Sequence, residues 1–264
     1  MSLPEALNFI PMFVLVFFRT CGLMLAAPLF GSTRIPRRLK VMFALVIAAG
    51  LINGVKVPPQ LPETNLQLAA GIGGELIFGL VMGMGASLTF IAIHWAGEIM
   101  GQQMGFNMAA SFDPQFGGGS SLVGDLYFML ALIVFLIIKG HHALIEGLAA
   151  SFKSLPLLAA GMDANLFNIF LGLLTGATVL AIKLAAPMLI SLLVVDLALG
   201  FIGKTMPQIN VMNTGVTIRS IAGMAILIVG LMLATSIFSE SLYDGITTIT
   251  RIWSTGGAAP PLRS

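Results

Sequence analysis

Six long stretches of apolar residues, separated by short polar segments, account for most of the chain. They cover residues 9–30, 41–55, 76–97, 126–138, 166–202 and 221–238. None shows the two-residue alternation of a half-exposed strand, so each is predicted to be helical. Apolar runs of about 18 residues or more are typical of transmembrane helices. The pattern therefore predicts an all-α membrane-type protein.

Three of these runs depart from a simple spanning helix. The second and fourth are short enough to be buried or re-entrant helices. The fifth contains Pro187 and is too long for one simple span, so it is either one long helix kinked at the proline or two shorter helices. The expected fold is a set of helical hairpins with kinked or broken apolar helices.

The composition agrees with this class. Apolar residues make up 57% of the 264 residues and charged residues only 9%, whereas soluble domains are about 25% charged. The net charge is +2, from 13 basic and 11 acidic residues, with no broad basic surface for nucleic acid. A disordered or fibrous chain is excluded, and the composition argues against a soluble enzyme.

One dense basic segment sets the expected orientation. Arg34, Arg37, Arg38 and Lys40 lie between the first two apolar runs. The positive-inside rule places this segment on the cytoplasmic side and the N-terminus on the opposite side. The rule weakens further along the chain, because no Lys or Arg occurs between residues 98 and 138.

Glycine recurs at every fourth position at Gly97, Gly101 and Gly105. On a helix this spacing forms a bare stripe, which lets another helix approach closely, either within the chain or from another subunit. Met100, Met104 and Met108 form a second stripe with the same spacing. These methionines either fill gaps in the core or, being flexible, seal around something that moves.

A glycine-rich segment follows the stripe. Residues 109–125 include Asp113-Pro114 and three consecutive glycines, Gly117 to Gly119, which cannot sustain a helix. Irregular backbone at membrane depth is tolerated only inside protein or beside an aqueous cavity. The segment is therefore either a surface loop outside the bilayer or a lid or constriction, with Phe112 and Phe116 as apolar contacts.

Ionisable residues also occur within or beside the apolar runs. Arg19, Lys183 and Asp196 lie inside runs and Glu98 at an edge, and all four are predicted to be buried charges. Each costs about 2.5–3.5 kcal/mol in hydrocarbon on insertion scales, so each needs a partner or a wet cavity. Lys183 and Asp196 are about 20 Å apart along one helix, so each needs a partner on another helix or another subunit. Glu98 could form a proton relay with His94 or a purely structural pair.

No catalytic, cofactor-binding or metal-binding residue is predicted, so an enzymatic function is not expected. His141, His142 and Glu146 lack the HExxH spacing, and no phosphate-binding loop or nucleophile elbow occurs. Two rival interpretations stay open. One is a membrane enzyme that uses these three residues, and the other is a secondary transporter with its site at Lys183 and Asp196.

Three blocks in order resemble the FliR family of flagellar type III export proteins, whose virulence-secretion relatives are called SctT. The blocks are residues 17–45, with Arg19, Gly22, Pro28 and Pro36; residues 96–126, with the glycine-rich helix and loop; and residues 139–156, with Gly140, His141, Ser151, Phe152 and Pro156. Residues 183–193 and 206–220 are similar to the small protein FliQ.

The resemblance implies a division of the chain into three parts. Residues 1–165 would be a FliP-like helical part, residues 166–245 a FliQ-like helical hairpin, and residues 246–264 a flexible tail. The implied partners are FliP and FliQ in a helical assembly, then FlhB and FlhA, and unfolded flagellar export substrates. The implied location is the bacterial inner membrane at the flagellar basal body, with the complex raised toward the periplasm. Use in a virulence system is the alternative.

The resemblance also implies that residues 106–122 form a plug in the closed channel, with methionines of the assembly as a gasket below it. On this sequence the gasket candidates are Met100 and Met104. The plug residues would be Phe106, Asn107, Met108, Phe112, Asp113, Pro114, Gln115, Phe116, Gly117, Gly118 and Gly119.

Overall fold

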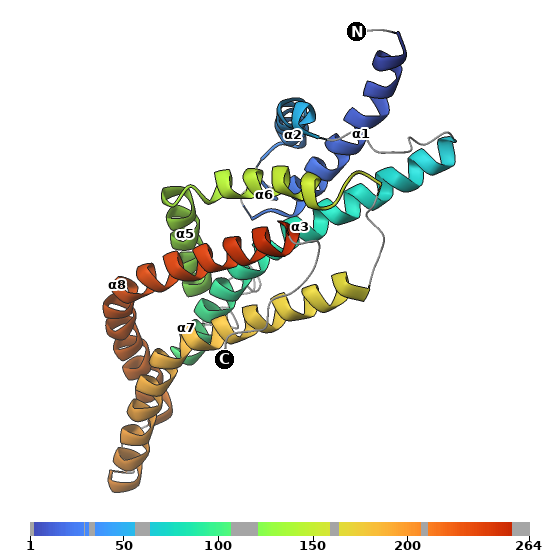
Figure 1. Cartoon of the computed structure of the whole chain (residues 1–264). Helices are drawn as coiled ribbons and strands as arrows, with labels where there is room; N and C mark the ends of the chain where they lie inside the picture. The colour runs from blue at the N-terminus through green and yellow to red at the C-terminus, as the bar shows by residue number, and fades with distance from the viewer. Residues whose placement is uncertain are drawn as a thin grey trace. The chain divides into compact units, whose positions relative to one another are not determined.

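The structure is a computed structural model that describes residues 3–28, 30–31, 35–55, 64–106, 121–158, 164–206 and 211–254. Within these ranges every regular element is a helix (Figure 1), which confirms the all-α prediction. The elements are α1 (Leu3–Ala26), α2 (Arg37–Leu51), the short 3-10 helix η1 (Ile52–Gly54), α3 (Asn65–Gln103), α5 (Leu122–Ile137), α6 (Gly140–Ser154), α7 (Ala164–Thr205) and α8 (Val211–Ser254).

The fifth apolar run forms one continuous helix, α7, which passes through Pro187. Of the two alternatives, the chain therefore adopts the long helix. One turn after the proline, the Ser191 hydroxyl donates a hydrogen bond to the Pro187 carbonyl at 2.8 Å. Residues 246–254 of the expected tail are helical, because α8 continues to Ser254. The rest of that tail lies outside the described residues.

The fourth run ends at a local reversal of backbone conformation. α5 stops at Ile137, and Lys139 has a φ of 57° before α6 begins at Gly140. A left-handed residue cannot continue an α-helix, so the apolar run is interrupted there. α5 alone, with 16 residues, is therefore shorter than a membrane span.

Four helices in the described ranges are long and apolar enough to cross a membrane. They contain the segments Phe9–Ala26, Asn65–Gln103, Leu171–Thr205 and Thr214–Leu231, and the interrupted pair of α5 and α6 could form a fifth span. The 39 residues of α3 correspond to about 58 Å of helix, roughly twice the hydrocarbon thickness of a bilayer. Part of such a helix must lie outside the hydrocarbon unless the helix is strongly tilted.

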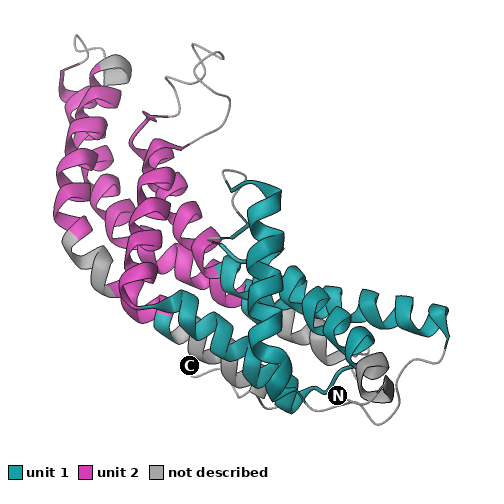
Figure 2. Cartoon of the chain, turned by 90° about the horizontal axis from the view of Figure 1, so that it is seen from above, with its two compact units in different colours: residues 1–88, 139–174, 243–264 teal, residues 89–138, 175–242 magenta. Residues whose placement is uncertain are grey.

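The chain divides into two compact units (Figure 2). Unit 1 contains residues 1–88, 139–174 and 243–264, and unit 2 contains residues 89–138 and 175–242. Each unit takes segments from both sides of the predicted boundary at residue 165. Compactness is a different property from resemblance to FliP or FliQ, so the division into FliP-like and FliQ-like parts stays a prediction.

In unit 1, glycines bring α1 and α3 into backbone contact. A Cβ atom on Gly83 would lie 2.6 Å from the Leu23 carbonyl oxygen, and one on Gly22 would lie 2.7 Å from the Leu80 nitrogen. The Ser87 hydroxyl donates to the Ala26 carbonyl on the same interface. Small residues permit this approach, which is a common way for membrane helices to pack.

In unit 2, aromatic and aliphatic side chains from four helices form the core. Its fully or nearly fully buried members include Phe90, Ile93, Met100, Met104, Phe135, Leu192 and Phe238. The rings of Tyr127 and Phe238 pack edge to face with centroids 5.4 Å apart, which joins α5 to α8.

Candidate functional site

Most of the predicted plug lies outside the described residues, which resume at Ser121 after residues 107–120. Asn107, Met108 and the predicted plug residues from Phe112 to Gly119 belong to this range. Phe106, the first residue of the predicted plug, is described and is half-buried. The geometry that bears on this segment is therefore that of its two anchors, the end of α3 and the start of α5, which both belong to unit 2.

The two anchors are held together by the glycine stripe. A Cβ atom on Gly97 would lie 2.6 Å from the Cα of Gly124 and 2.7 Å from the Val123 carbonyl oxygen. One turn later, a Cβ atom on Gly101 would lie 3.1 Å from the Ser121 hydroxyl. The glycine stripe therefore packs against a helix of the same chain, which agrees with the first of the two interpretations given for it.

Polar contacts reinforce this closure at the start of α5. The Ser121 hydroxyl caps the helix by accepting from the Gly124 N–H at 3.2 Å. Asp125, in the first turn, lies 3.3 Å from His94 Nε2. His94 thus pairs with Asp125 rather than with Glu98, so the proposed relay between His94 and Glu98 is not formed. The neighbouring helix offers a carboxylate at a better position than the residue one turn along.

Farther from the anchors, aromatic rings continue the same helix pairing. Phe90 packs edge to face against Phe128 and Phe135, with ring centroids 5.9 and 5.3 Å apart. Phe90, early in this part of α3, contacts Phe135 late in α5, whereas Gly101, later in α3, lies beside Ser121 at the start of α5. The two helices therefore run antiparallel. The two ends of the glycine-rich segment, Gly105 and Ser121, therefore lie at the same end of this helix pair.

The gasket candidates Met100 and Met104 are buried within unit 2. A Cβ atom on Gly223 of α8 would lie 3.1 Å from Met104 Cε, and the Ser220 hydroxyl donates to the Met104 carbonyl at 2.7 Å. Both methionines fill the core in this chain, as one of the two interpretations holds. Their role as a gasket in the assembly stays a prediction.

Gly105 plays a different part from the other two glycines of the stripe. Its φ is +82°, in the left-handed region, and its N–H donates to the Gln102 carbonyl at 3.0 Å. A left-handed glycine is a common helix terminator. Gly105 therefore ends α3 directly before the glycine-rich segment. A Cβ atom on Gly105 would also lie 3.2 Å from the Val216 side chain of α8.

The four predicted buried charges have different environments in the single chain. Arg19 is fully buried, Glu98 and Asp196 are half-buried, and Lys183 is exposed. Within the described part of the chain, neither Glu98 nor Lys183 forms an ion pair. Lys183 is exposed on α7 in the described part of the single chain. Its burial by another subunit therefore stays a prediction.

Asp196 forms an ion pair with Arg219 of α8. The pair joins the two helices of the C-terminal hairpin, and its side chains are 31% and 40% exposed. The sequence argument placed the partner of Asp196 on another helix or subunit, but Arg219 was not singled out. Arg219 lies outside the apolar runs, where a charged residue has no evident need for a partner.

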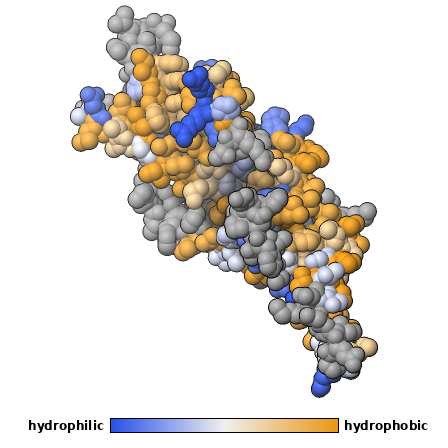
Figure 3. All heavy atoms as spheres, turned by 180° about the vertical axis from the view of Figure 1, so that it is seen from behind, coloured by the Kyte–Doolittle hydropathy of each residue, from blue (hydrophilic) through white to orange (hydrophobic). Residues whose placement is uncertain are grey.

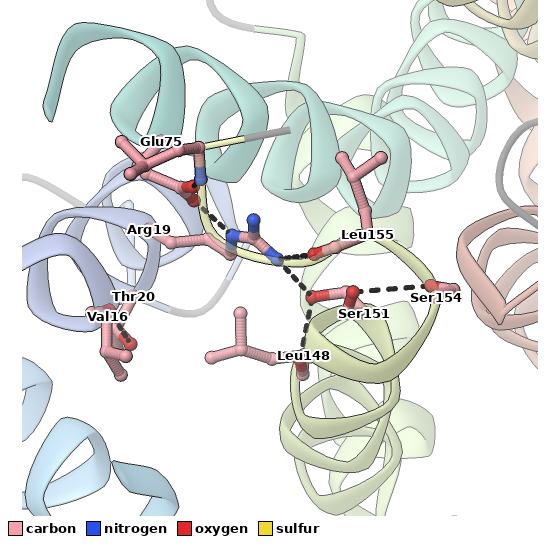
Figure 4. Close-up of polar contacts among 9 residues, drawn as sticks. Val16, Arg19, Thr20, Glu75, Leu148, Ser151, Ser154 and Leu155 are labelled. Atoms are coloured by element: carbon pink, nitrogen blue, oxygen red, sulfur yellow. Dashed lines mark hydrogen bonds and ion pairs between the residues drawn. The ribbon is translucent and has the colours of Figure 1, made fainter. Parts of the chain in front are cut away.

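A buried polar cluster in unit 1 surrounds Arg19 (Figure 4). Arg19 Nε donates to Glu75 Oε2 at 2.5 Å, and both side chains are fully buried. Arg19 Nη1 donates to the Ser151 hydroxyl at 3.3 Å and to the Leu155 carbonyl at 3.1 Å. The cluster therefore ties α1 to α3, to α6 and to the residues that follow α6.

The same cluster satisfies the second oxygen of Glu75 and stacks the guanidinium between rings. Glu75 Oε1 accepts from the Leu158 N–H at 3.0 Å. The Arg19 guanidinium carbon lies 4.8 Å from the Phe78 ring centroid and 4.4 Å from that of Phe152. A buried charge held by this many partners is a structural brace. Glu75 and Ser151 were not predicted as its partners, because nothing in the linear sequence joins residues so far apart.

The three residues of the enzyme alternative lie on α6 of unit 1. The rings of His141 and His142 are 4.4 Å apart, while Glu146 is exposed. In the part of the chain that the structure describes, no three His, Cys, Asp or Glu side chains gather as metal ligands. The contacts of these residues therefore add no support to that alternative.

Comparison with known proteins identifies the class. The family described as "Bacterial export proteins, family 1" matches residues 10–244. The flagellar biosynthetic protein FliR of Bacillus subtilis (strain 168) is 31% identical over 226 residues, 84% of this chain and 87% of that protein. The FliR protein of Pectobacterium carotovorum is 32% identical over 250 residues, 89% and 92% of the two chains.

A more distant relative has the same name and similar coverage. FliR of Escherichia coli (strain K12) is 28% identical over 236 residues, 86% of this chain and 87% of that protein. The chain belongs to the bacterial export protein family 1. The resemblance inferred from three sequence blocks is thus confirmed over nearly the whole chain, and the apolar helices identify a membrane-embedded export protein.

Proposed function

We propose that this chain is a subunit of the flagellar type III export channel. In this proposal it assembles with FliP and FliQ proteins, and residues 106–122 obstruct the passage of unfolded substrates at rest. The observation that carries the proposal is the antiparallel clamp between α3 and α5. It fixes both ends of the glycine-rich segment at one place, through Gly97 on Gly124 and Gly101 on Ser121.

A clamp of this kind suits a plug because an obstruction must be localised but deformable. The helix pair supplies a rigid base, and the glycines Gly117 to Gly119 can act as the hinge. Phe112 and Phe116 would supply apolar contacts in the closed state. The closed state need be favoured by only a few kcal/mol, so binding of a substrate or partner protein can open it.

The exposed surface of the C-terminal hairpin supports assembly with other subunits. The best membrane-span windows of α7 and α8 are only 28% and 17% buried, compared with 56% for α3. Large exposed side chains on these two helices include Ile190, Leu193, Val194, Phe201, Ile221 and Val229. Figure 3 shows apolar side chains over much of the described surface on the face that it presents. Lipid or other helices must cover such a surface.

Helix length supports the proposed position in the inner membrane at the flagellar base, partly raised toward the periplasm. α3, α7 and α8 contain 39, 42 and 44 residues, each well beyond the roughly 20 that cross a bilayer. Neighbouring protein would then cover the apolar portions that leave the hydrocarbon. FlhB and FlhA are further proposed partners of the assembly, and no step of the proposed gating requires a catalytic residue or cofactor in this chain.

The test is the conductance of the assembled complex. The chain lacking residues 112–119 is produced together with its FliP and FliQ partners, and ion conductance is recorded in planar bilayers. We expect a marked increase in open current. A matched control lacks residues 256–263, eight residues of the C-terminal segment, and should keep the wild-type current.

A complex of normal composition with wild-type conductance would refute the plug role. If the deletion prevents assembly, the double variant Phe112→Ala and Phe116→Ala tests the same idea without shortening the segment. Recovery of the chain without FliP or FliQ under conditions in which both are produced would refute the assembly part of the proposal.

A further inference from the structure

The start of α2 carries an unusual concentration of positive charge. Arg37, Arg38 and Lys40 all lie in its first turn, which contains no acidic residue. Backbone dipoles already make a helix N-terminus positive, equivalent to about half an elementary charge, so acidic residues are the ones favoured there. In the described ranges none of these three cations forms an ion pair. The first turn of α2 is therefore poised for an anion.

The remaining surface of α2 identifies the kind of anion. Of its large apolar side chains, Met42 is 59% exposed, Phe43 50% and Val46 70%, and Leu39, Val41 and Leu45 are also exposed. Only small residues, Ala44 and Ala48, are buried in α2, which packs beside α1 within unit 1 (Figure 1). A cationic end thus continues directly into an apolar outer face.

The length of α2 restricts where it can lie. Its 15 residues correspond to about 22 Å, less than the roughly 30 Å of hydrocarbon that a spanning helix must cross. With its basic end held at the headgroup level, the helix reaches into only part of the bilayer. The positive-inside rule places this end at the cytoplasmic leaflet, where anionic lipids are concentrated.

We propose that α2 is a binding site for an anionic phospholipid of the cytoplasmic leaflet. The phosphate lies at the first turn against Arg37, Arg38 and Lys40, and the acyl chains lie along the exposed face that includes Met42 and Val46. An inorganic anion or an acidic protein segment would neutralise the cations but leave the adjacent apolar side chains uncovered. A phospholipid satisfies both parts of the surface with one molecule.

The experiment measures lipid retention by the full chain purified in a neutral detergent. Phosphatidylglycerol or phosphatidylcholine is added, bound lipid is counted by native mass spectrometry, and apparent affinity is taken from the shift in thermal midpoint. The test variant combines R37Q, R38Q and K40Q. The control combines K139Q, K153Q and K204Q, which removes the same charge at three exposed lysines elsewhere.

We expect the wild-type chain and the control to prefer phosphatidylglycerol. Each cation near a membrane surface is worth about 1 kcal/mol, so the test variant should bind phosphatidylglycerol about a hundredfold more weakly. Equal retention of both lipids by the wild-type chain would overturn the proposal, as would unchanged binding by the test variant. If the test variant does not fold, the comparison of the two lipids on the wild-type chain decides by itself.

Two further arms separate the competing occupants. Inorganic phosphate at millimolar concentration should not displace phosphatidylglycerol, and displacement would show a simple anion site. The same measurement on the complex with FliP and FliQ should again show bound phosphatidylglycerol that depends on the three cations. Loss of the lipid on assembly would show that a protein surface covers α2 and would overturn the proposal.

Discussion

The two arginine–carboxylate pairs of this chain occupy opposite environments. Arg19 and Glu75 in unit 1 are fully buried and are surrounded by further donors, acceptors and rings. Arg219 and Asp196 in unit 2 join two helices whose outer faces are largely exposed, and their side chains are 40% and 31% exposed. The first pair is completed within the chain, whereas the second lies on a surface that the chain leaves uncovered.

This difference indicates that the region around Arg19 is stabilised within the chain to a greater extent than the α7–α8 hairpin. A buried ion pair is costly unless nearly every polar atom is matched, and the Arg19 cluster matches both oxygens of Glu75 and two of the three guanidinium nitrogens. α7 and α8 instead keep most of their apolar surface free. Unit 1 is therefore stabilised by contacts within the chain, whereas the exposed apolar faces of α7 and α8 need lipid or another protein to cover them.

The largest effect on stability is expected from Arg19→Met. This change leaves the buried Glu75 carboxylate without its cation, which should cost about 3–5 kcal/mol of unfolding free energy. Chemical unfolding of the purified chain in detergent measures it. The double variant Arg19→Met and Glu75→Gln should recover part of the loss. A double variant that is no more stable than the single one would contradict the brace interpretation.

A smaller but clear effect is expected from Gly79→Ala. Its new Cβ would press on the backbone carbonyl of Arg19 in α1, and such overpacking should cost about 1–3 kcal/mol. The matched control is Gly176→Ala on α7, where a Cβ atom has no neighbour within 4 Å. Because alanine favours helix, the control should be neutral or stabilised by up to about 1 kcal/mol. Equal losses at the two positions would show that the contacts of the glycine do not matter.

Asp196→Asn should have a modest effect on the single chain. Partly exposed ion pairs contribute about 0–1 kcal/mol, since solvent screens them. Thermal unfolding in detergent should therefore change far less than for Arg19→Met. A loss as large as that of the Arg19 variant would mean that the second pair braces the chain as strongly as the first, and the contrast between them would fail.

The smallest change in stability is expected from Gly200→Leu on the exposed side of α7. A Cβ atom at this position meets nothing within 4 Å, so the thermal midpoint of the isolated chain should stay the same or rise slightly, because leucine favours helix more than glycine does. If other subunits cover this face, the same variant should lower the yield of complex with FliP and FliQ, measured by co-purification. Normal yield would indicate that lipid rather than protein lies against Gly200.

Local chemistry made several features predictable from the sequence. Continuous apolar runs specify helices because a backbone in an apolar medium must satisfy its own hydrogen bonds, and every predicted run overlaps an observed helix. The glycine spacing from Gly97 to Gly101 predicted close packing, and Gly97 and Gly101 do lie against α5. The plug role of the glycine-rich segment stays a prediction, since residues 107–120 lie outside the described ranges.

In contrast, the ion-pair partners of charged residues and the exposure of individual side chains could be learned only from the folded structure. Arg19 meets Glu75, Asp196 meets Arg219, and His94 meets Asp125 because helices distant in sequence lie against one another. A run of apolar residues records that an environment is apolar, but it does not record whether lipid, the same chain or another subunit provides it. That choice depends on which helix faces are brought together, so Met104 is buried while Lys183 is exposed.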